Sequence, residues 1–199
     1  MKVIRGILLA AGRGSRFGAD KLLHPLPDAP DTPRSAPPAQ TIATAAAVTL
    51  IEVIPDCVAV CRPEQKQLIT QLRAIGYHVT TCANADQGMG FSLATAVEAT
   101  DPIDDLIIAL ADMPYVSKST IAEISRRLTG GAALVQPLYQ NKPGNPVGIS
   151  RHLRQQLLAP QGDFGARHLL RQQSELLERF EVDDAGVIRD IDYPDDLAN

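Results

Sequence analysis

Apolar residues along the chain gather in short continuous runs, which alternate with longer amphipathic or alanine-rich segments. The short runs predict buried strands at residues 4–11, 57–61, 78–82, 106–111, 132–137 and 146–149. The longer segments predict helices at residues 41–54, 64–75, 91–99 and 119–128. This alternation predicts an α/β fold, in which a mostly parallel sheet carries helices on both faces and the fully apolar run 106–111 lies at its centre.

Two segments depart from the alternation. Residues 24–40 contain six prolines and little that could pack, which predicts a surface loop or a partly mobile flap. Near the C-terminus, the apolar positions in 187–191 predict an extended piece, and Pro194 is expected to open a short helix with acidic residues in its first turn. The chain has no internal repeat, so we interpret residues 1–199 as one domain.

The composition excludes several classes of function. A formal net charge of −4 argues against nucleic-acid binding, which needs a basic face. No apolar run approaches the roughly 20 residues of a membrane span, so we expect no membrane partner. Cys57 and Cys61 lie on one face of a predicted strand, and we interpret them as small buried residues. Reduced thiols favour a cytoplasmic location.

A glycine-rich loop with Gly12, Gly14 and Gly18 follows the first predicted strand. Glycines let backbone N–H groups approach an anion, and the two arginines and final lysine of the loop supply positive charge. The spacing fits neither the dinucleotide fingerprint nor the P-loop. The loop is therefore predicted to bind phosphate in a way that belongs to neither of these classes.

Two aspartates are candidates for a metal site. Asp112 is the first polar residue at the end of the apolar run 106–111, where open α/β sheets bind their ligands, and Pro114 stiffens the turn. A carboxylate there suits Mg²⁺, which takes one or two carboxylates plus substrate phosphates; the alternative is that Asp112 caps the turn. Asp192 precedes the predicted C-terminal helix and is either an N-cap or a second metal ligand.

Three further glycine-containing segments occur at residues 87–92, 142–147 and 162–167. The first leads into a predicted helix, whose N-terminal amides suit an anion or a ribose hydroxyl. Each segment taken alone is more often a plain turn. The four histidines are scattered without partner spacing, and the sequence shows no nucleophile–base–acid arrangement.

Taken in order, six motifs resemble those of the MobA-like nucleotidyltransferases, and the nearest branch is the molybdenum cofactor cytidylyltransferases. The motifs are L-A-A-G-x-G-x-R-x-G-x-x-K at 9–21, G-M-G-x-S-L at 88–93, A-D-M-P at 111–114, G-N-P-V at 144–147, G-D-x-G-A-R at 162–167 and D-I-D-x-P-x-D-L at 190–197. They span nearly the whole chain. The resemblance implies a three-layer, Rossmann-like nucleotidyltransferase fold and Mg²⁺ as cofactor.

The resemblance implies transfer of CMP from CTP to the terminal phosphate of molybdopterin or its molybdenum form, with release of pyrophosphate. CTP is preferred over GTP because guanine-specific members tend to read L-A-G-G where this chain has Ala11. The implied catalytic and metal-binding residues are Arg16, Lys21, Asp112 and Asp192. The implied nucleotide-binding positions are Leu9, Ala10, Ala11, Gly12, Arg13, Gly14, Gln87, Gly88 and Ser92. Acceptor binding is expected at Gly144, Asn145 and Pro146.

The sequence departs from the family pattern in the proline-rich segment, at Phe91 and at Asn145, where His is common. All three differences lie where the acceptor is expected, so the acceptor is less well defined than the chemistry. One alternative is a chaperone that carries the cofactor to a molybdenum hydroxylase. Others are a nucleotidyltransferase that uses GTP or another phosphorylated acceptor, and an oxidoreductase on the same scaffold. The missing dinucleotide fingerprint counts against the oxidoreductase.

Overall fold

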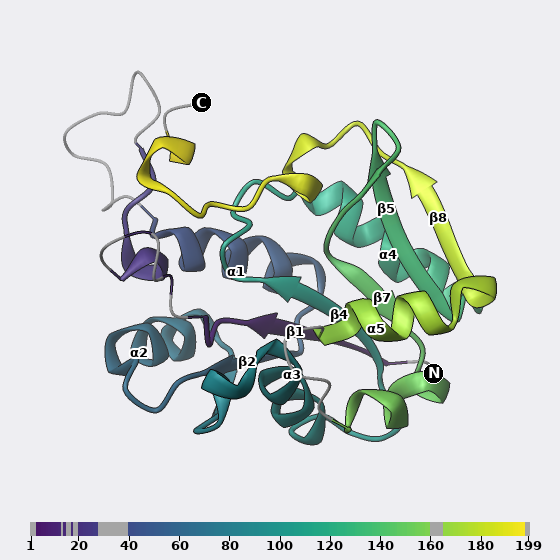
Figure 1. The fold of residues 1–199 in the computed structure, drawn as a ribbon, viewed down its shortest axis with the longest axis horizontal. Helices are drawn as coiled ribbons and strands as arrows, with labels where there is room; N and C mark the ends of the chain where they lie inside the picture. The colour runs from purple at the N-terminus through teal and green to yellow at the C-terminus, as the bar shows by residue number, and fades with distance from the viewer. Residues whose placement is uncertain are drawn as a thin grey trace.

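An eight-stranded mixed sheet runs through the computed structural model, which describes residues 3–12, 14, 17, 20–27, 40–159 and 165–197 (Figure 1). The strand order is β3-β2-β1-β4-β7-β5-β6, and β8 pairs with β5. The strands are β1 (Ile4–Leu9), β2 (Cys57–Cys61), β3 (His78–Thr81), β4 (Asp105–Leu110), β5 (Leu134–Tyr139), β6 (Lys142–Pro143), β7 (Val147–Ile149) and β8 (Leu177–Glu181). The strands β1 to β4 pair in parallel, whereas β7 is antiparallel to both β4 and β5.

Helices pack on both faces of this sheet, which gives the fold three layers (Figure 1). One face carries α1 (Ile42–Val53), α2 (Lys66–Ile75) and α4 (Lys118–Gly130), and the other carries α3 (Met89–Glu98) and α5 (Gly165–Gln172). Leu8 of β1 packs in the first core, while its neighbours Ile7 and Leu9 pack in the second. Because both faces are buried, the strands are apolar at successive positions. The predicted α/β class with a mostly parallel sheet is confirmed.

The predicted strands and helices are present within a few residues of their expected bounds. β4 lies in the interior of the sheet as expected, although its neighbour β7 is antiparallel. The extended piece predicted at 187–191 is wrong in its first part, since Ala185–Ile188 is a 3-10 helix. The Asp184 carboxylate accepts the N–H of Gly186 at 3.0 Å and turns the chain there. Pro194–Leu197 forms the predicted short helix, also of the 3-10 type.

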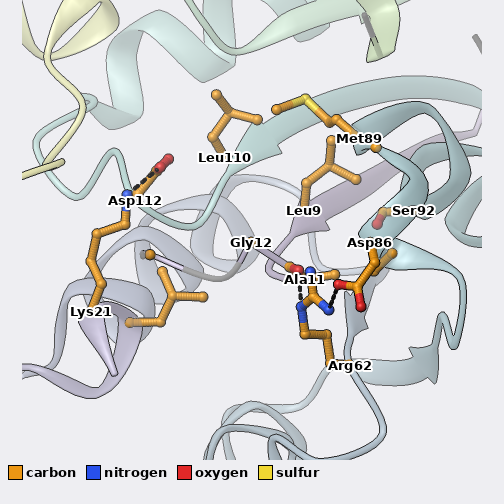
Figure 2. Close-up of a pocket in the computed structure, with 14 residues that line it drawn as sticks. Leu9, Ala11, Gly12, Lys21, Arg62, Asp86, Met89, Ser92, Leu110 and Asp112 are labelled. Atoms are coloured by element: carbon orange, nitrogen blue, oxygen red, sulfur yellow. Dashed lines mark hydrogen bonds and ion pairs between the residues drawn. The ribbon is translucent and has the colours of Figure 1, made fainter. Parts of the chain in front are cut away.

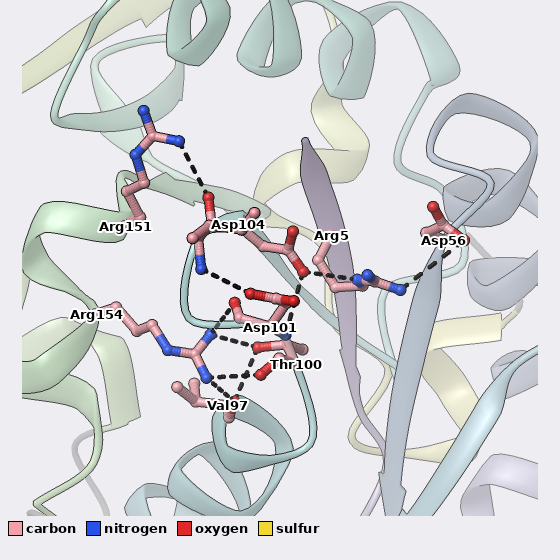
Figure 3. Close-up of polar contacts among 9 residues, drawn as sticks. Arg5, Asp56, Val97, Thr100, Asp101, Asp104, Arg151 and Arg154 are labelled. Atoms are coloured by element: carbon pink, nitrogen blue, oxygen red, sulfur yellow. Dashed lines mark hydrogen bonds and ion pairs between the residues drawn. The ribbon is translucent and has the colours of Figure 1, made fainter. Parts of the chain in front are cut away.

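A polar network lies at the edge of the sheet where β1 and β4 begin (Figure 3). Arg154 is buried, and its guanidinium donates to the carbonyl oxygens of Val97 and Thr100 at 2.5 and 2.9 Å. Val97 lies in the last turn of α3 and Thr100 follows the helix; the Val97 carbonyl also accepts the Thr100 N–H at 3.0 Å, and Arg154 adds donors to the carbonyls where α3 ends. Nearby, the guanidinium of Arg5 donates to the Asp104 carboxylate at 3.0 Å. Arg154 and Arg5 therefore stabilise this edge through bonds to backbone carbonyls and to a carboxylate of the same chain.

Two expectations from composition concern the cysteines and membrane spans. Cys57 and Cys61 are buried free thiols, as interpreted from the sequence, and Cys82 is buried as well. Burial raises the pKa of Cys57 and of Cys61 to about 12, which keeps both as neutral, weakly reactive thiols. Within the described ranges, no helix has the length and apolar character needed to cross a membrane.

The two ends of the proline-rich segment lie side by side. The N–H of Leu26 donates to the carbonyl of Gln40 at 2.8 Å, and Pro25 forms a β-bridge with Thr41. The predicted loop or flap itself falls on residues 28–39, which lie outside the described residues. This pairing places residues 25–26 next to residues 40–41, immediately before α1 begins at Ile42.

Candidate functional site

A cavity of about 640 Å³ lies beyond the carboxyl ends of β1, β2 and β4 (Figure 2). Leu9 ends β1, and the glycine-rich loop adds Ala11, Gly12 and Gly14. The remaining walls are formed by Lys21, Leu22, Arg62, Ala85, Asp86, Gly88, Met89, Ser92, Leu110 and Asp112. The volume lies in the usual range of small-molecule sites, about 300–1,000 Å³. The fold thus brings the glycine-rich loop and Asp112 to one cavity.

Gly14 allows the loop to fold closely over the side chain of Lys21. Its φ of +58° is left-handed, and a Cβ atom at this position would lie 2.8 Å from the Cβ of Lys21. Any larger residue would therefore be strained both in its backbone and against the lysine. Lys21 then opens a short 3-10 helix, Lys21–Leu23. Gly14 and Lys21 thus lie in close contact at the edge of the cavity.

Lys21 joins the two aspartates that the sequence singled out. Its Nζ donates to Asp112 Oδ2 at 2.9 Å and to Asp192 Oδ1 at 3.0 Å, and its side chain is only 8% exposed. Burial by itself would lower the pKa of the ammonium, but the two carboxylates outweigh burial and raise it above the usual value. Lys21 therefore keeps its positive charge at every pH where the protein is expected to work.

Backbone contacts fix the position of Asp192 beside Asp112. The N–H of Ile191 donates to the Asp112 carbonyl at 3.0 Å. The carboxylate of Asp196 accepts the N–H groups of Tyr193 and Asp192 at 2.7 and 2.8 Å, and these two bonds lower its pKa. Asp196 is thus the acid that caps this turn, while the side chain of Asp192 contacts Lys21.

Arg62 forms the opposite end of the cavity and was not found by the sequence reasoning (Figure 2). Its side chain is largely buried; Nε donates to the Ala11 carbonyl at 2.6 Å, and the guanidinium pairs with the Asp86 carboxylate. These bonds hold the carbonyl of the residue that the resemblance associates with the base. The only signal in the sequence is a single arginine directly after the strand predicted at 57–61.

The N-terminal turn of α3 borders the same cavity. Gly88 precedes the helix with a left-handed φ of +123°, and Met89 and Ser92 line the cavity from its first turn. The first N–H groups of a helix have no partner within the helix, so this turn offers donors to an anionic or hydroxyl-bearing ligand. Gly88 and Ser92, which the resemblance implies as nucleotide-binding residues, both line this cavity.

Two other residues predicted to bind the nucleotide, Ala10 and Gln87, do not line the first cavity. Ala10 packs in the core beneath α1 and α2, and Gln87 is exposed outside the lining of the cavity. Arg13 and Arg16 lie outside the described residues, as does the beginning of the motif at 162–167.

A second cavity of about 740 Å³ adjoins the first and shares Leu9, Met89 and Leu110 with it. Asn145 lines this second cavity, whereas Gly144 and Pro146 do not. Gly144 has a structural reason to be glycine, because a Cβ atom would lie 2.5 Å from the Val187 carbonyl oxygen. The three expected acceptor residues thus form one turn, of which Asn145 reaches the cavity.

The donor set of the first cavity fits a divalent cation that is completed by its substrate. Asp112 and Asp192 direct carboxylate oxygens at one point, which the Lys21 ammonium holds. Among the described residues, no group of three or more His, Cys, Asp or Glu side chains forms a protein-only metal cage. Two carboxylates with room for phosphate oxygens are a usual environment for Mg²⁺.

A family model described as the MobA-like NTP transferase domain matches residues 6–176. The chain belongs to this family. It is therefore an enzyme of the nucleotidyltransferase class, and NTP is the substrate that the family implies. The matched region runs from within β1 to the 3-10 turn before β8 and contains every residue that lines the first cavity. Asp192, the second partner of Lys21, lies beyond its end.

Two curated proteins are similar over nearly the full length. The chain is 26% identical to nicotine blue oxidoreductase of Paenarthrobacter nicotinovorans, covering 95% of this chain and 92% of that protein. It is also 26% identical to purine catabolism protein PucB of Bacillus subtilis, covering 96% and 92%. Among solved structures, the manganese complex of Rv0371c from Mycobacterium tuberculosis superposes with a TM-score of 0.77 at 21% identity, covering 99% and 97% of the two chains. This likeness confirms the nucleotidyltransferase fold.

Proposed function

We propose that the protein is a cytidylyltransferase, which transfers CMP from CTP to the terminal phosphate of molybdopterin or its molybdenum form and releases pyrophosphate. The observation that carries this proposal is the meeting of Lys21, Asp112 and Asp192 at one end of a nucleotide-sized cavity. The family supports an NTP as one substrate. The six ordered motifs, with their resemblance to molybdenum cofactor cytidylyltransferases, support the acceptor.

In the proposed reaction, an oxygen of the acceptor phosphate attacks the α-phosphorus of CTP. The new phosphorus–oxygen bond forms as the bond from the α-phosphorus to the oxygen bridging the β-phosphate breaks, and pyrophosphate leaves with that electron pair. Two anions must be brought together, so the protein acts chiefly by positioning and by neutralising charge. Lys21 supplies positive charge at the Asp112 end of the cavity, and we assign the same role to Arg16. No protein nucleophile is needed, because the acceptor phosphate is already ionised.

Asp112 and Asp192 are the residues that would hold Mg²⁺. The metal, when bound, supplies Lewis-acid stabilisation of the phosphate oxygens. A relative was crystallised as a manganese complex, which supports a divalent cation in this fold. The two carboxylates also orient the Lys21 ammonium, and this contribution of the chain is visible without the metal.

The base is proposed to lie against the backbone of residues 9–12, at the Arg62 end of the cavity. Arg62 fixes the Ala11 carbonyl. A carbonyl oxygen held in one position can discriminate the exocyclic groups of cytosine and guanine through hydrogen bonds. The remaining nucleotide contacts are assigned to Arg13, Gly14, Gln87, Gly88 and Ser92. The acceptor is placed in the adjoining cavity beside Asn145.

The proposal is tested with purified protein, CTP, MgCl₂ and molybdopterin, by measuring pyrophosphate release and the cytosine dinucleotide product. Asp112→Asn should abolish transfer, since it removes a carboxylate that holds Lys21 and the metal. The matched control is Asp183→Asn, an exposed aspartate outside both cavities, which should retain wild-type turnover. Wild-type activity with GTP and none with CTP would contradict the base assignment.

The similarity to nicotine blue oxidoreductase favours an oxidoreductase as the second candidate. A thermal-shift comparison of CTP, GTP, ATP and NADPH, each with and without Mg²⁺, separates the two. Mg²⁺-dependent stabilisation by CTP supports nucleotidyl transfer, whereas stabilisation by NADPH alone supports the oxidoreductase. The chaperone alternative instead predicts tight binding of the dinucleotide product, a stable complex with a molybdenum hydroxylase and negligible turnover.

A further inference from the structure

Three arginines line the second cavity. Arg167 and Arg171 extend from α5, and Arg179 extends from β8, which pairs with β5 at the edge of the sheet. All three are exposed to solvent. Residues from two separate elements thus bring positive charge to one cavity, in a chain whose formal net charge is −4.

These arginines have no carboxylate partner in the part of the chain that the structure describes. No ion pair or side-chain hydrogen bond involves Arg167, Arg171 or Arg179 there, and no acidic residue lines the cavity. The contrast is with Arg126 and Arg127 on α4, which share the Glu123 carboxylate. Unpaired arginines gathered on a concave surface favour an anionic ligand.

The arrangement on α5 works against the stability of that helix. Arg167 and Arg171 are four residues apart, so they lie on the same face of the helix and repel each other. Arg171, in the last turn, gains a small compensation from the helix dipole, whereas Arg167, near the start of the helix, has an unfavourable position. An anion that contacts both side chains would remove this repulsion.

The rest of the cavity suits the body of a small molecule. Ile108 and Val147 from the sheet and Leu170 from α5 supply apolar surface, and Gln136 and Asn145 add amide groups. The cavity meets the first one at Leu9, Met89 and Leu110, so a ligand can reach from one cavity into the other.

We propose that Arg167, Arg171 and Arg179 bind the anionic acceptor and determine the enzyme's preference for a phosphorylated one. This inference rests on the proposed nucleotidyl transfer. The three arginines supply the positive charge that binds the acceptor, so that its phosphate can reach the α-phosphate of the bound nucleotide. The arginines take no part in bond making. The acceptor phosphate oxygen forms the new bond to the α-phosphorus, and pyrophosphate leaves from the first cavity with the electron pair of the broken bond.

The test compares steady-state kinetics of wild type and Arg171→Gln/Arg179→Gln with CTP and molybdopterin as varied substrates. We expect the KM for molybdopterin to rise about tenfold or more, with kcat and the KM for CTP changed by less than about twofold. The matched control is Lys66→Gln/Arg73→Gln, which removes the same charge from exposed positions on α2 and should leave all three constants unchanged. Phenylglyoxal labelling with mass spectrometry gives a second readout, in which molybdopterin protects the three arginines and CTP does not.

The outcomes separate this inference from the proposed function. An inactive wild type that does not bind CTP contradicts the proposed function itself. An active wild type with an unchanged molybdopterin KM in the double variant overturns the role of the arginines alone. An increase confined to the KM for CTP, or a loss of pyrophosphate product inhibition, overturns it as well, because the arginines would then contact the triphosphate.

Discussion

Replacing Lys21 by Met removes the ammonium that Asp112 and Asp192 share and keeps the length of the side chain. Removal of one partner from a fully buried ion pair costs about 3–5 kcal/mol. The side chains of Asp112 and Asp192 are 27% and 36% exposed, so water screens part of their repulsion. We therefore expect a loss of about 2 kcal/mol in the free energy of unfolding. For a chain of this length, that loss lowers Tm by about 4–8 °C.

The change in Tm on adding Mg²⁺ tests whether Lys21 and the metal share the two carboxylates. In wild type the metal must compete with the ammonium for the two carboxylates, whereas in Lys21→Met it meets no such competitor. Added MgCl₂ should therefore raise Tm more in the variant than in wild type, although the variant has lost transfer activity. Differential scanning calorimetry with and without MgCl₂ measures the stability, and pyrophosphate release measures the activity.

The difference in Tm between wild type and Lys21→Met should depend on pH in one direction. The folded-state pKa of Lys21 is raised above 10.5, so its stabilising contribution is complete below that pH and is lost as the pH rises through the raised pKa. The Tm difference between wild type and Lys21→Met should thus be constant at neutral pH and shrink above pH 10.5. The exposed Lys66→Met serves as control. The reasoning is refuted if Lys21→Met melts within about 1 °C of wild type, or if Mg²⁺ raises both Tm values equally.

Three further predictions follow from individual contacts. Arg62→Met removes the donor to the Ala11 carbonyl and the partner of Asp86, so isothermal titration should show CTP affinity reduced by about tenfold, with Arg73→Met unchanged. Arg154→Met removes the buried guanidinium that donates to the Val97, Thr100 and Asp101 carbonyls and should lower the free energy of unfolding in urea by about 2–4 kcal/mol, while kcat of the folded enzyme stays within about twofold of wild type. Native protein at pH 8 should react slowly with a thiol reagent until urea unfolds it, because all three cysteines are buried and the pKa of Cys57 and Cys61 is about 12; rapid native labelling would contradict this.

Local sequence patterns were sufficient for most of the secondary structure. A strand buried on both faces needs an apolar residue at every position, so β2 and β4 could be recognised without knowing their neighbours. β8 (Leu177–Glu181) was missed because three of its five residues are charged, as suits a strand at the edge of the sheet. The 3-10 turn at Ala185–Ile188 was missed because it depends on the Asp184 side chain rather than on hydrophobic spacing.

The sequence by itself determined the α/β class, the glycine-rich loop and the two aspartates, because each depends on residues that are close together along the chain. The tertiary structure alone decided that Lys21 contacts Asp112 and Asp192, which are 91 and 171 residues away. It also placed Arg62 on the Ala11 carbonyl, 51 residues distant, although no motif marks that arginine. The physical reason is that parallel strands end at the same edge of the sheet, so residues at these ends become neighbours through strand order rather than through sequence spacing.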